Sequence, residues 1–382
     1  MFESLYVYGL LGLLMISFGY VEARNWQAVP KGQGIRKRRT FWDAANLLPI
    51  LLFAMVFGSR YMVGVDYRHY LEYYLNGGRD FEPGFQVVSD LMSGLGVHYA
   101  WFFGFWALIQ ISLLYYAYRY ERYLFPWFAF FLIFGSGYFS WMNVIRHQLA
   151  ACIFLVSIEF IEKKQPFKYY LLVLLAFLFH KSAILLVIVY PLIRWRRDWF
   201  TRPWVQFLLL AFAVFLGKHY EWVVTFVEQP FILFTSLAGF DNYALGILYN
   251  ETLNDRTQFG QNTGFGLYAR LLKVIPVILY SVPMKRYYRS DRFNIAYTFW
   301  FIAVLAGFAL ESSIVLSRPF VFVSNFSSII MPAYFMNYCF KRRTKVRIIV
   351  ATLYLALVLL LFLNIILHGE SNYNAFHFFW EY

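Results

Sequence analysis

Apolar runs about as long as a bilayer is thick recur along nearly the whole chain, and they restrict its fold more than any other feature. A membrane-spanning helix needs roughly 20 mostly apolar residues. The runs define about twelve segments, two of them short: 4–21, 44–59, 100–118, 124–140, 144–161, 168–180, 182–193, 204–218, 266–283, 293–311, 320–339 and 348–367. Only 14% of the residues are charged, whereas soluble domains have about 25%. The sequence therefore predicts an all-α, polytopic transmembrane helical bundle.

The basic residues indicate how the chain crosses the membrane. Most of the 34 Lys and Arg residues fall in six clusters between apolar runs, at 24–39, 119–122, 163–168, 194–202, 285–292 and 341–347. If the twelve segments alternate in direction, all six clusters lie on one side, and the positive-inside rule makes that side cytoplasmic. The net charge of +13 then reflects topology, so we expect no nucleic-acid partner. The long polar segments near 60–99 and 218–266 lie outside, and no separable soluble domain is visible within residues 1–382.

The two short segments predict a broken hairpin. Each arm has about 11 apolar residues, roughly 17 Å of helix, which is too short to cross a bilayer. The turn Phe179-His180-Lys181-Ser182 is therefore expected below the outer surface, at the floor of a cavity, because irregular backbone at that depth must be buried in protein or line water. His180 is a candidate base there; the alternative is a hydrogen-bonded structural histidine.

A second group of polar residues follows the segment 44–59. Asp66 comes two residues after Gly64, and Glu82 precedes a Pro-Gly turn. Both carboxylates are candidate catalytic groups. Asp80 is better explained as an ordinary polar residue of a solvated loop.

Arginines near the predicted outer ends of the segments suggest an anionic ligand. Arg146 begins an otherwise apolar segment, and Gln148 adds a polar group deeper in. An isolated charge in such a segment is usually functional, although it can also extend to the membrane surface. Together with Arg60, Arg270 and Arg318 it forms a predicted clamp for phosphate, because guanidinium groups bind phosphate oxygens in pairs and stay charged when buried.

The two cysteines, Cys152 and Cys339, both lie inside apolar runs, and neither has a CxxC or CxxH neighbour. We infer no disulfide framework, no metal site and no cofactor.

The order of four short motifs resembles that of a known family. These motifs are Gly64-Val-Asp-Tyr-Arg-His-Tyr, Glu82-Pro-Gly-Phe, Ile145-Arg-His-Gln-Leu-Ala and Phe179-His-Lys-Ser-Ala. The sequence resembles the EpsG family of membrane proteins, relatives of the Wzy-type polymerases of O-antigen, capsule and exopolysaccharide. The resemblance covers roughly residues 50–200 well and the remainder by topology.

The resemblance implies a metal-independent, inverting glycosyltransferase of the GT-C type. Such an enzyme joins oligosaccharide repeat units carried on undecaprenyl pyrophosphate, at the outer face of a bacterial inner membrane and in contact with its lipid. A chain-length regulator protein could be a further partner. The catalytic candidates are His180, Asp66 and Glu82, with His180 or Asp66 favoured as the base. The candidate substrate-binding residues are Arg60, Tyr67, Tyr70, Arg146, Gln148, Lys181, Arg270 and Arg318.

Other functions fit a membrane bundle with a cationic cavity. The nearest is an O-antigen ligase-like glycosyltransferase, which shares the donor. A flippase or another transporter is less consistent, because the sequence has no visible two-fold repeat and its polar groups cluster on one side. A membrane acyltransferase would use the buried histidine as its base.

Overall fold

The computed structural model describes residues 2–27, 41–78, 81–135, 137–219, 264–310, 314–369 and 372–381. These residues are almost entirely helical, in agreement with the predicted all-α membrane protein. Two compact units are present, the first formed by Met1–Arg197 with Ser328–Tyr382 and the second by Asp198–Ser327. A single domain over residues 1–382 stays a prediction.

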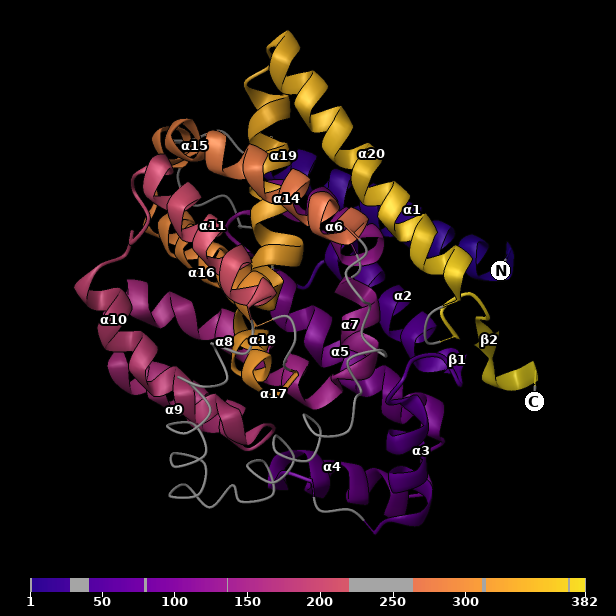
Figure 1. Cartoon of the computed structure of the whole chain (residues 1–382). Helices are drawn as coiled ribbons and strands as arrows, with labels where there is room; N and C mark the ends of the chain where they lie inside the picture. Colours follow the sequence, from indigo (N-terminus) through magenta and orange to yellow (C-terminus); the bar gives the residue numbers. More distant parts are fainter. Residues whose placement is uncertain are drawn as a thin grey trace. The chain divides into compact units, whose positions relative to one another are not determined.

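Unit 1 is built around long apolar helices. Its first part contains α1 (Phe2–Gln27), α2 (Ala44–Ser59), α5 (Tyr99–Ala117), η1 (Arg122–Leu124), α6 (Phe125–Phe134), α7 (Gly137–Asn143) and α8 (Ile145–Glu162). α5 contacts both α2 and α8, while α1 contacts α2 and α6. The helices α19 (Met331–Lys341) and α20 (Lys345–His368) complete the unit, and both contact α6 (Figure 1).

Side-chain caps set where several of these helices begin. Asp43 precedes α2, and its Oδ1 accepts a hydrogen bond from the main-chain N–H of Asn46 at 3.2 Å. Thr344 acts in the same way before α20, accepting from the N–H of Arg347 at 3.3 Å. Each cap satisfies a main-chain donor that has no partner within its helix.

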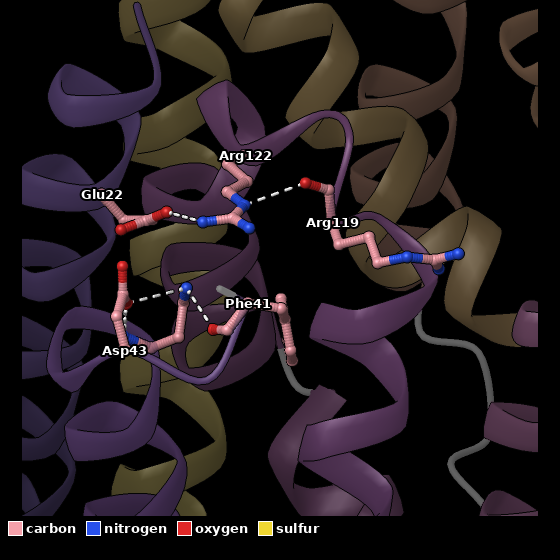
Figure 2. Close-up of polar contacts among 6 residues, drawn as sticks. Glu22, Phe41, Asp43, Arg119 and Arg122 are labelled. Atoms are coloured by element: carbon pink, nitrogen blue, oxygen red, sulfur yellow. Dashed lines mark hydrogen bonds and ion pairs between the residues drawn. The ribbon is translucent and has the colours of Figure 1, made fainter. Parts of the chain in front are cut away.

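Buried ion pairs join three helices at one end of unit 1. Arg122 pairs with Glu22 near the end of α1, and its Nε donates to the carbonyl of Arg119 at 2.9 Å (Figure 2). The side chains of Arg122 and Glu22 are only 6% and 2% exposed. Arg119 in turn donates to Glu159 of α8 at 2.5 Å. We call Glu22, Arg119, Arg122 and Glu159 the Arg122 cluster; it lies at the end of these helices that the sequence assigns to the cytoplasm.

The polar segment 60–99 folds into two short helices, α3 (Tyr67–Asn76) and α4 (Pro83–Gly94), which lie beyond the ends of α2 and α5 (Figure 1). α3 buries most of its aromatic side chains, namely Tyr67, Tyr70, Tyr73 and Tyr74. The hydroxyl of Tyr73 donates to Asp90 of α4 at 2.8 Å. Burial of this aromatic face favours helix over irregular loop for a segment that hydropathy alone marks only as polar.

The predicted hairpin is present in unit 1. α9 (Pro166–Phe177) ends just before His180, and the chain continues as the 3-10 helix η2 (Lys181–Ile188) and α10 (Val189–Trp195). The two arms run antiparallel, and the hydroxyl of Tyr169 donates to the carbonyl of Leu186 at 2.6 Å across them. The helix therefore breaks at the turn that the sequence indicated.

A short strand lies near the end of unit 1. β2 (His377–Phe378) pairs antiparallel with β1 (Arg60–Tyr61), which follows α2 directly. η7 (Phe379–Glu381) follows β2. The end of the chain is thus joined to the start of the segment that carries Asp66.

Unit 2 is a separate helical group. It contains α11 (Pro203–Lys218), α14 (Gly264–Leu279), α15 (Ser281–Tyr288), α16 (Asp291–Ala309), α17 (Ile314–Ser317), η4 (Arg318–Phe320) and α18 (Val321–Asn325); the π-helical turn Phe326–Ile330 then leads into α19. α16 packs on α11. Lys285 of α15 bonds to Asp198 at 2.6 Å and to the carbonyl of Phe200 at 2.5 Å, which fixes the chain before α11.

Five of the described helices are long and apolar enough to cross a membrane, or up to seven if each of two bent pairs is one span. The five are Phe2–Trp26, Tyr99–Ala117, Asp291–Ala309, Arg318–Lys341 and Lys345–His368. Each of the twelve predicted segments overlaps a helical stretch, but several of those stretches are too short to qualify alone. The count of twelve spans and the GT-C fold stay predictions.

Candidate functional site

Glu82 connects three of the sequence motifs within unit 1. It is the N-cap residue of α4, and Pro83 after it favours the first helical turn. The carboxylate is 8% exposed and pairs through Oε2 with Arg146 of α8. Its other oxygen, Oε1, accepts from the main-chain N–H of Lys181 at 3.3 Å. One buried carboxylate thus holds an arginine and the hairpin turn together.

A main-chain contact fixes the same turn against α4. The N–H of Gly84 donates to the carbonyl of Leu178 at 2.8 Å. A Cβ atom at Gly84 would lie 2.9 Å from that carbonyl oxygen, closer than side chains approach backbone. Glycine is therefore required here for the close approach of α4 to the hairpin.

Arg146 is the one arginine at this end of α8, and its side chain is 23% exposed. The guanidinium lies over the ring of Phe81, 4.2 Å from its centroid, and 6.0 Å from that of Phe85. Its Nε is buried and has no hydrogen-bond partner. Arg146 is thus held in place by Glu82 and Phe81 while part of its donor capacity remains for a ligand.

Two histidines stack beside this arginine. The rings of His147 and His180 lie 3.9 Å apart with an interplanar angle of 20°, and both residues are buried. Nδ1 of His180 accepts from the N–H of Ser182 at 3.3 Å and lies 2.7 Å from its hydroxyl oxygen. Because a main-chain N–H can only donate, a neutral His180 carries its proton on Nε2.

Asp66 lies close to the same group. It precedes α3 in a loop where Gly64 adopts a φ of +100°, and Asn143 Oδ1 accepts from the N–H of Val65 at 2.8 Å. Asp66 is one helical turn before Tyr70. Burial raises the pKa of Tyr70, the charge of Asp66 adds to the rise, and Arg146 opposes it. Tyr70 therefore stays protonated between a carboxylate and a guanidinium. We call Asp66, Tyr70, Glu82, Arg146, His147 and His180 the Glu82 cluster.

Three other predicted residues of unit 1 have different surroundings. Arg60 is fully buried, and its three nitrogens donate to the carbonyls of Val63 at 3.2 Å, Phe57 at 2.7 Å and Met142 at 3.2 Å. Tyr67 stacks on Phe103, and Gln148 is fully buried in α8. All three are part of the packed interior of unit 1, and substrate contacts for them stay predictions.

The remaining predicted site residues are Lys181 in unit 1 and Arg270 and Arg318 in unit 2. Lys181 is exposed at the start of η2, next to Glu82. Arg270 and Arg318 belong to unit 2, where Arg270 donates to the carbonyl of Gly307 at 3.2 Å and Arg318 is exposed. The four-arginine clamp therefore stays a prediction. Asp80 lies outside the described residues.

The sequence motifs did not single out Phe81 or His147 as site residues. Phe81 supports the guanidinium of Arg146, and its position directly before Glu82 was the available signal. His147 follows Arg146 in the sequence, but only the fold brings its ring onto His180. In the part of the chain that the structure describes, no group of three or more His, Cys, Asp or Glu side chains is arranged to hold a metal ion.

Comparison with protein families matches residues 45–379 to the EpsG family. The match extends over most of the chain, so it includes both units. No curated protein and no solved structure matches the chain.

Proposed function

Because the chain belongs to the EpsG family, a family similar to the Wzy-type polysaccharide polymerases, we propose that it joins oligosaccharide repeat units carried on undecaprenyl pyrophosphate. The reaction takes place at the outer face of a bacterial inner membrane. It is a metal-independent, inverting glycosyl transfer, and its centre is the Glu82 cluster.

The observation that carries this proposal is the meeting of the four motifs at one place. Residues that are as many as about 100 positions apart in the sequence contact each other through Glu82, Arg146 and the turn before Lys181. A buried Glu-Arg pair with a partly exposed guanidinium, next to two imidazoles, is suited to bind a charged leaving group.

In the proposed reaction, a sugar hydroxyl of the incoming unit attacks the anomeric carbon of the growing chain. The bond from that carbon to the pyrophosphate oxygen breaks, and undecaprenyl pyrophosphate leaves with the electron pair. The hydroxyl proton passes to a base. The pyrophosphate is already a good leaving group, so the reaction needs charge stabilisation more than a general acid, unlike glycoside hydrolysis. Arg146 supplies that stabilisation.

Asp66 is the base that this geometry favours. Each carboxylate oxygen of Glu82 already accepts one hydrogen bond, from Arg146 and from the N–H of Lys181, so Glu82 is better suited to hold Arg146 than to take a proton. His180 accepts through Nδ1 and would present a donor, Nε2–H, to the substrate. Asp66 is half-buried at the start of α3, and its charge acts on Tyr70, the residue that Arg146 also reaches. We therefore assign proton removal to Asp66 and hydrogen bonding of a phosphate oxygen to His180.

The test is complementation of a strain that lacks its own copy of this gene. Arg146→Ala should abolish long-chain glycan at an unchanged level of membrane-inserted protein. The control is Arg68→Ala, because Arg68 is 75% exposed on α3 and, among the described residues, pairs with its neighbour Glu72. Long-chain ladders from Arg146→Ala equal to those from Arg68→Ala would refute the site.

The same gels separate the alternative activities. Loss of a polymerase leaves glycans of a single repeat, loss of a ligase leaves polymer on its lipid, and loss of a flippase leaves no glycan outside. Single-repeat glycan in the deletion strain is the expected result, and either other pattern contradicts the proposal.

A further inference from the structure

The residues after α20 bind to several separate parts of unit 1. β2 pairs with β1 in the register Arg60 with Phe378 and Tyr61 with His377. The N–H of Phe376 donates to Ser4 Oγ at 2.8 Å. The ring of Phe379 lies 4.9 Å from that of His98 at the start of α5. A tail of residues 372–381, which we call the C-terminal tail, therefore crosses the ends of α1, α2 and α5.

Tyr373 is the buried anchor of the C-terminal tail. It is 6% exposed, and its ring stacks on Phe139 of α7 with centroids 4.3 Å apart. Its hydroxyl accepts a hydrogen bond from Asn143 Nδ2 at 2.5 Å. A tyrosine 230 positions away thus contacts the residue that closes α7 immediately before α8.

Asn143 transmits this contact to the loop that carries Asp66. Its Oδ1 accepts from the N–H of Val65 at 2.8 Å. A main-chain N–H can only donate, so the amide oxygen faces Val65 and the amide nitrogen faces Tyr373. A Cβ at Gly64 would lie 2.7 Å from Asn143 Oδ1, so the loop is pressed directly against this side chain.

We propose that the C-terminal tail positions the Asp66 loop against the end of α7, with Tyr373 and Asn143 as its positioning residues. Tyr373 fixes the orientation of the Asn143 amide, and Asn143 holds the backbone at Val65, next to Asp66. The effect of this arrangement on polymer formation rests on the proposed function. The arrangement itself does not.

Hydrogen–deuterium exchange tests the positioning directly. Tyr373→Phe keeps the stacked ring but removes the hydroxyl and its bonds to Asn143 and to the carbonyl of Phe139. Exchange in a peptide covering residues 61–66 should rise by about fivefold, the factor expected when the bond from Val65 to Asn143 is lost. The matched control is Tyr334→Phe, whose hydroxyl bonds to Glu121 at 2.6 Å near the Arg122 cluster. The control should leave that peptide unchanged. Equal exchange in wild type and Tyr373→Phe overturns the proposal.

A double-mutant cycle tests the path through Asn143. Asn143→Ala removes both the acceptor for the N–H of Val65 and the donor to Tyr373, so it should raise exchange at least as much as Tyr373→Phe does. The double variant should show no more exchange than Asn143→Ala alone, because Tyr373 acts on the loop through Asn143. Fully additive effects overturn the path through Asn143.

The consequence for synthesis is measured in the complemented strain. Both single variants should shorten the glycan ladder at unchanged protein level, whereas Tyr334→Phe should not. Raised exchange with ladders of normal length overturns the link to synthesis. If even wild type restores no ladder, the proposed function fails, and the exchange measurement still decides the positioning role.

Discussion

The two ends of α8 each carry a buried glutamate-arginine pair, but the arginine is more exposed at one end than at the other. Arg146 and Glu159 are about 20 Å apart along the helix. In the Arg122 cluster Arg119, the partner of Glu159, is 12% exposed. Its neighbour Arg122 is 6% exposed and lies over the rings of Trp26 and Phe41 at 4.9 and 5.7 Å. In the Glu82 cluster Arg146 is 23% exposed and its Nε has no partner.

This difference suggests two roles for the same pair of residue types. A pair that is enclosed on all sides contributes to the packing of α1, α5 and α8 and offers nothing to a ligand. A pair whose arginine is partly exposed can bind an anion that arrives from outside. Variants in the Arg122 cluster should therefore lower the amount of folded protein, whereas variants in the Glu82 cluster should lower the amount of glycan product.

The largest effect is expected from Arg122→Ala. It leaves Glu22 buried without its partner, which costs about 3–5 kcal/mol of folding free energy. The level of inserted protein and its melting temperature in detergent should both fall. Replacing both residues by apolar ones, Arg122→Met with Glu22→Leu, should recover most of the loss. If Arg122→Ala alone had a normal melting temperature, the Arg122 cluster would not contribute to stability.

Glu82→Gln should lower polymer formation by about 100-fold without loss of protein, because a misplaced catalytic group costs about that factor. One amide oxygen cannot hold both Arg146 and the N–H of Lys181 as two carboxylate oxygens do. The control is Glu72→Gln on the exposed face of α3. Equal polymer yields from the two variants would show that the charge of Glu82 has no part in the reaction.

Gly84→Ala should destabilise the protein by about 1–3 kcal/mol, the usual cost of a forced contact in a packed region. The new Cβ would press on the carbonyl of Leu178 and move the hairpin turn away from α4. Gly94→Ala is the matched control in the same helix, because nothing lies within 4 Å of a Cβ there. If Gly84→Ala and Gly94→Ala had the same melting temperature, the close packing of α4 on the hairpin turn would be contradicted.

Tyr73→Phe should have the smallest effect, about 1 kcal/mol, because it removes one hydrogen bond. Burial, and then the bond to Asp90, raise the pKa of Tyr73, so its hydroxyl remains a donor at neutral pH. The variant should loosen α3 from α4 and slightly lower the melting temperature. A fall in melting temperature as large as that of Gly84→Ala would contradict the assignment of a single hydrogen bond between α3 and α4 to Tyr73.

The sequence predicted the elements better than their arrangement. Apolar length located the helices, and the short length of two neighbouring apolar runs located the hairpin turn at His180, because both follow from local composition. Two facts were not visible locally: α3 buries its tyrosines, and Phe81 supports Arg146. Both depend on contacts between segments far apart in the chain.

The site was predicted in part for the same reason. Charge and motif order selected Glu82, Arg146 and His180, which the fold brings together. The same criterion also selected Arg60, whose donors are used by three main-chain carbonyls. A sequence shows that an arginine lies at a helix end, but not whether the surrounding backbone already satisfies it.

Labelling from one side of the membrane tests the site most directly. Lys181 is exposed beside Glu82, and Lys163 is 50% exposed at the other end of α8, while both native cysteines are buried. In spheroplasts, a membrane-impermeant maleimide should label Lys181→Cys but not Lys163→Cys, and added undecaprenyl pyrophosphate should slow the labelling of Lys181→Cys. Labelling of Lys163→Cys alone, or labelling of Lys181→Cys at a rate that the lipid does not change, would contradict an outward-facing pyrophosphate site at the Glu82 cluster.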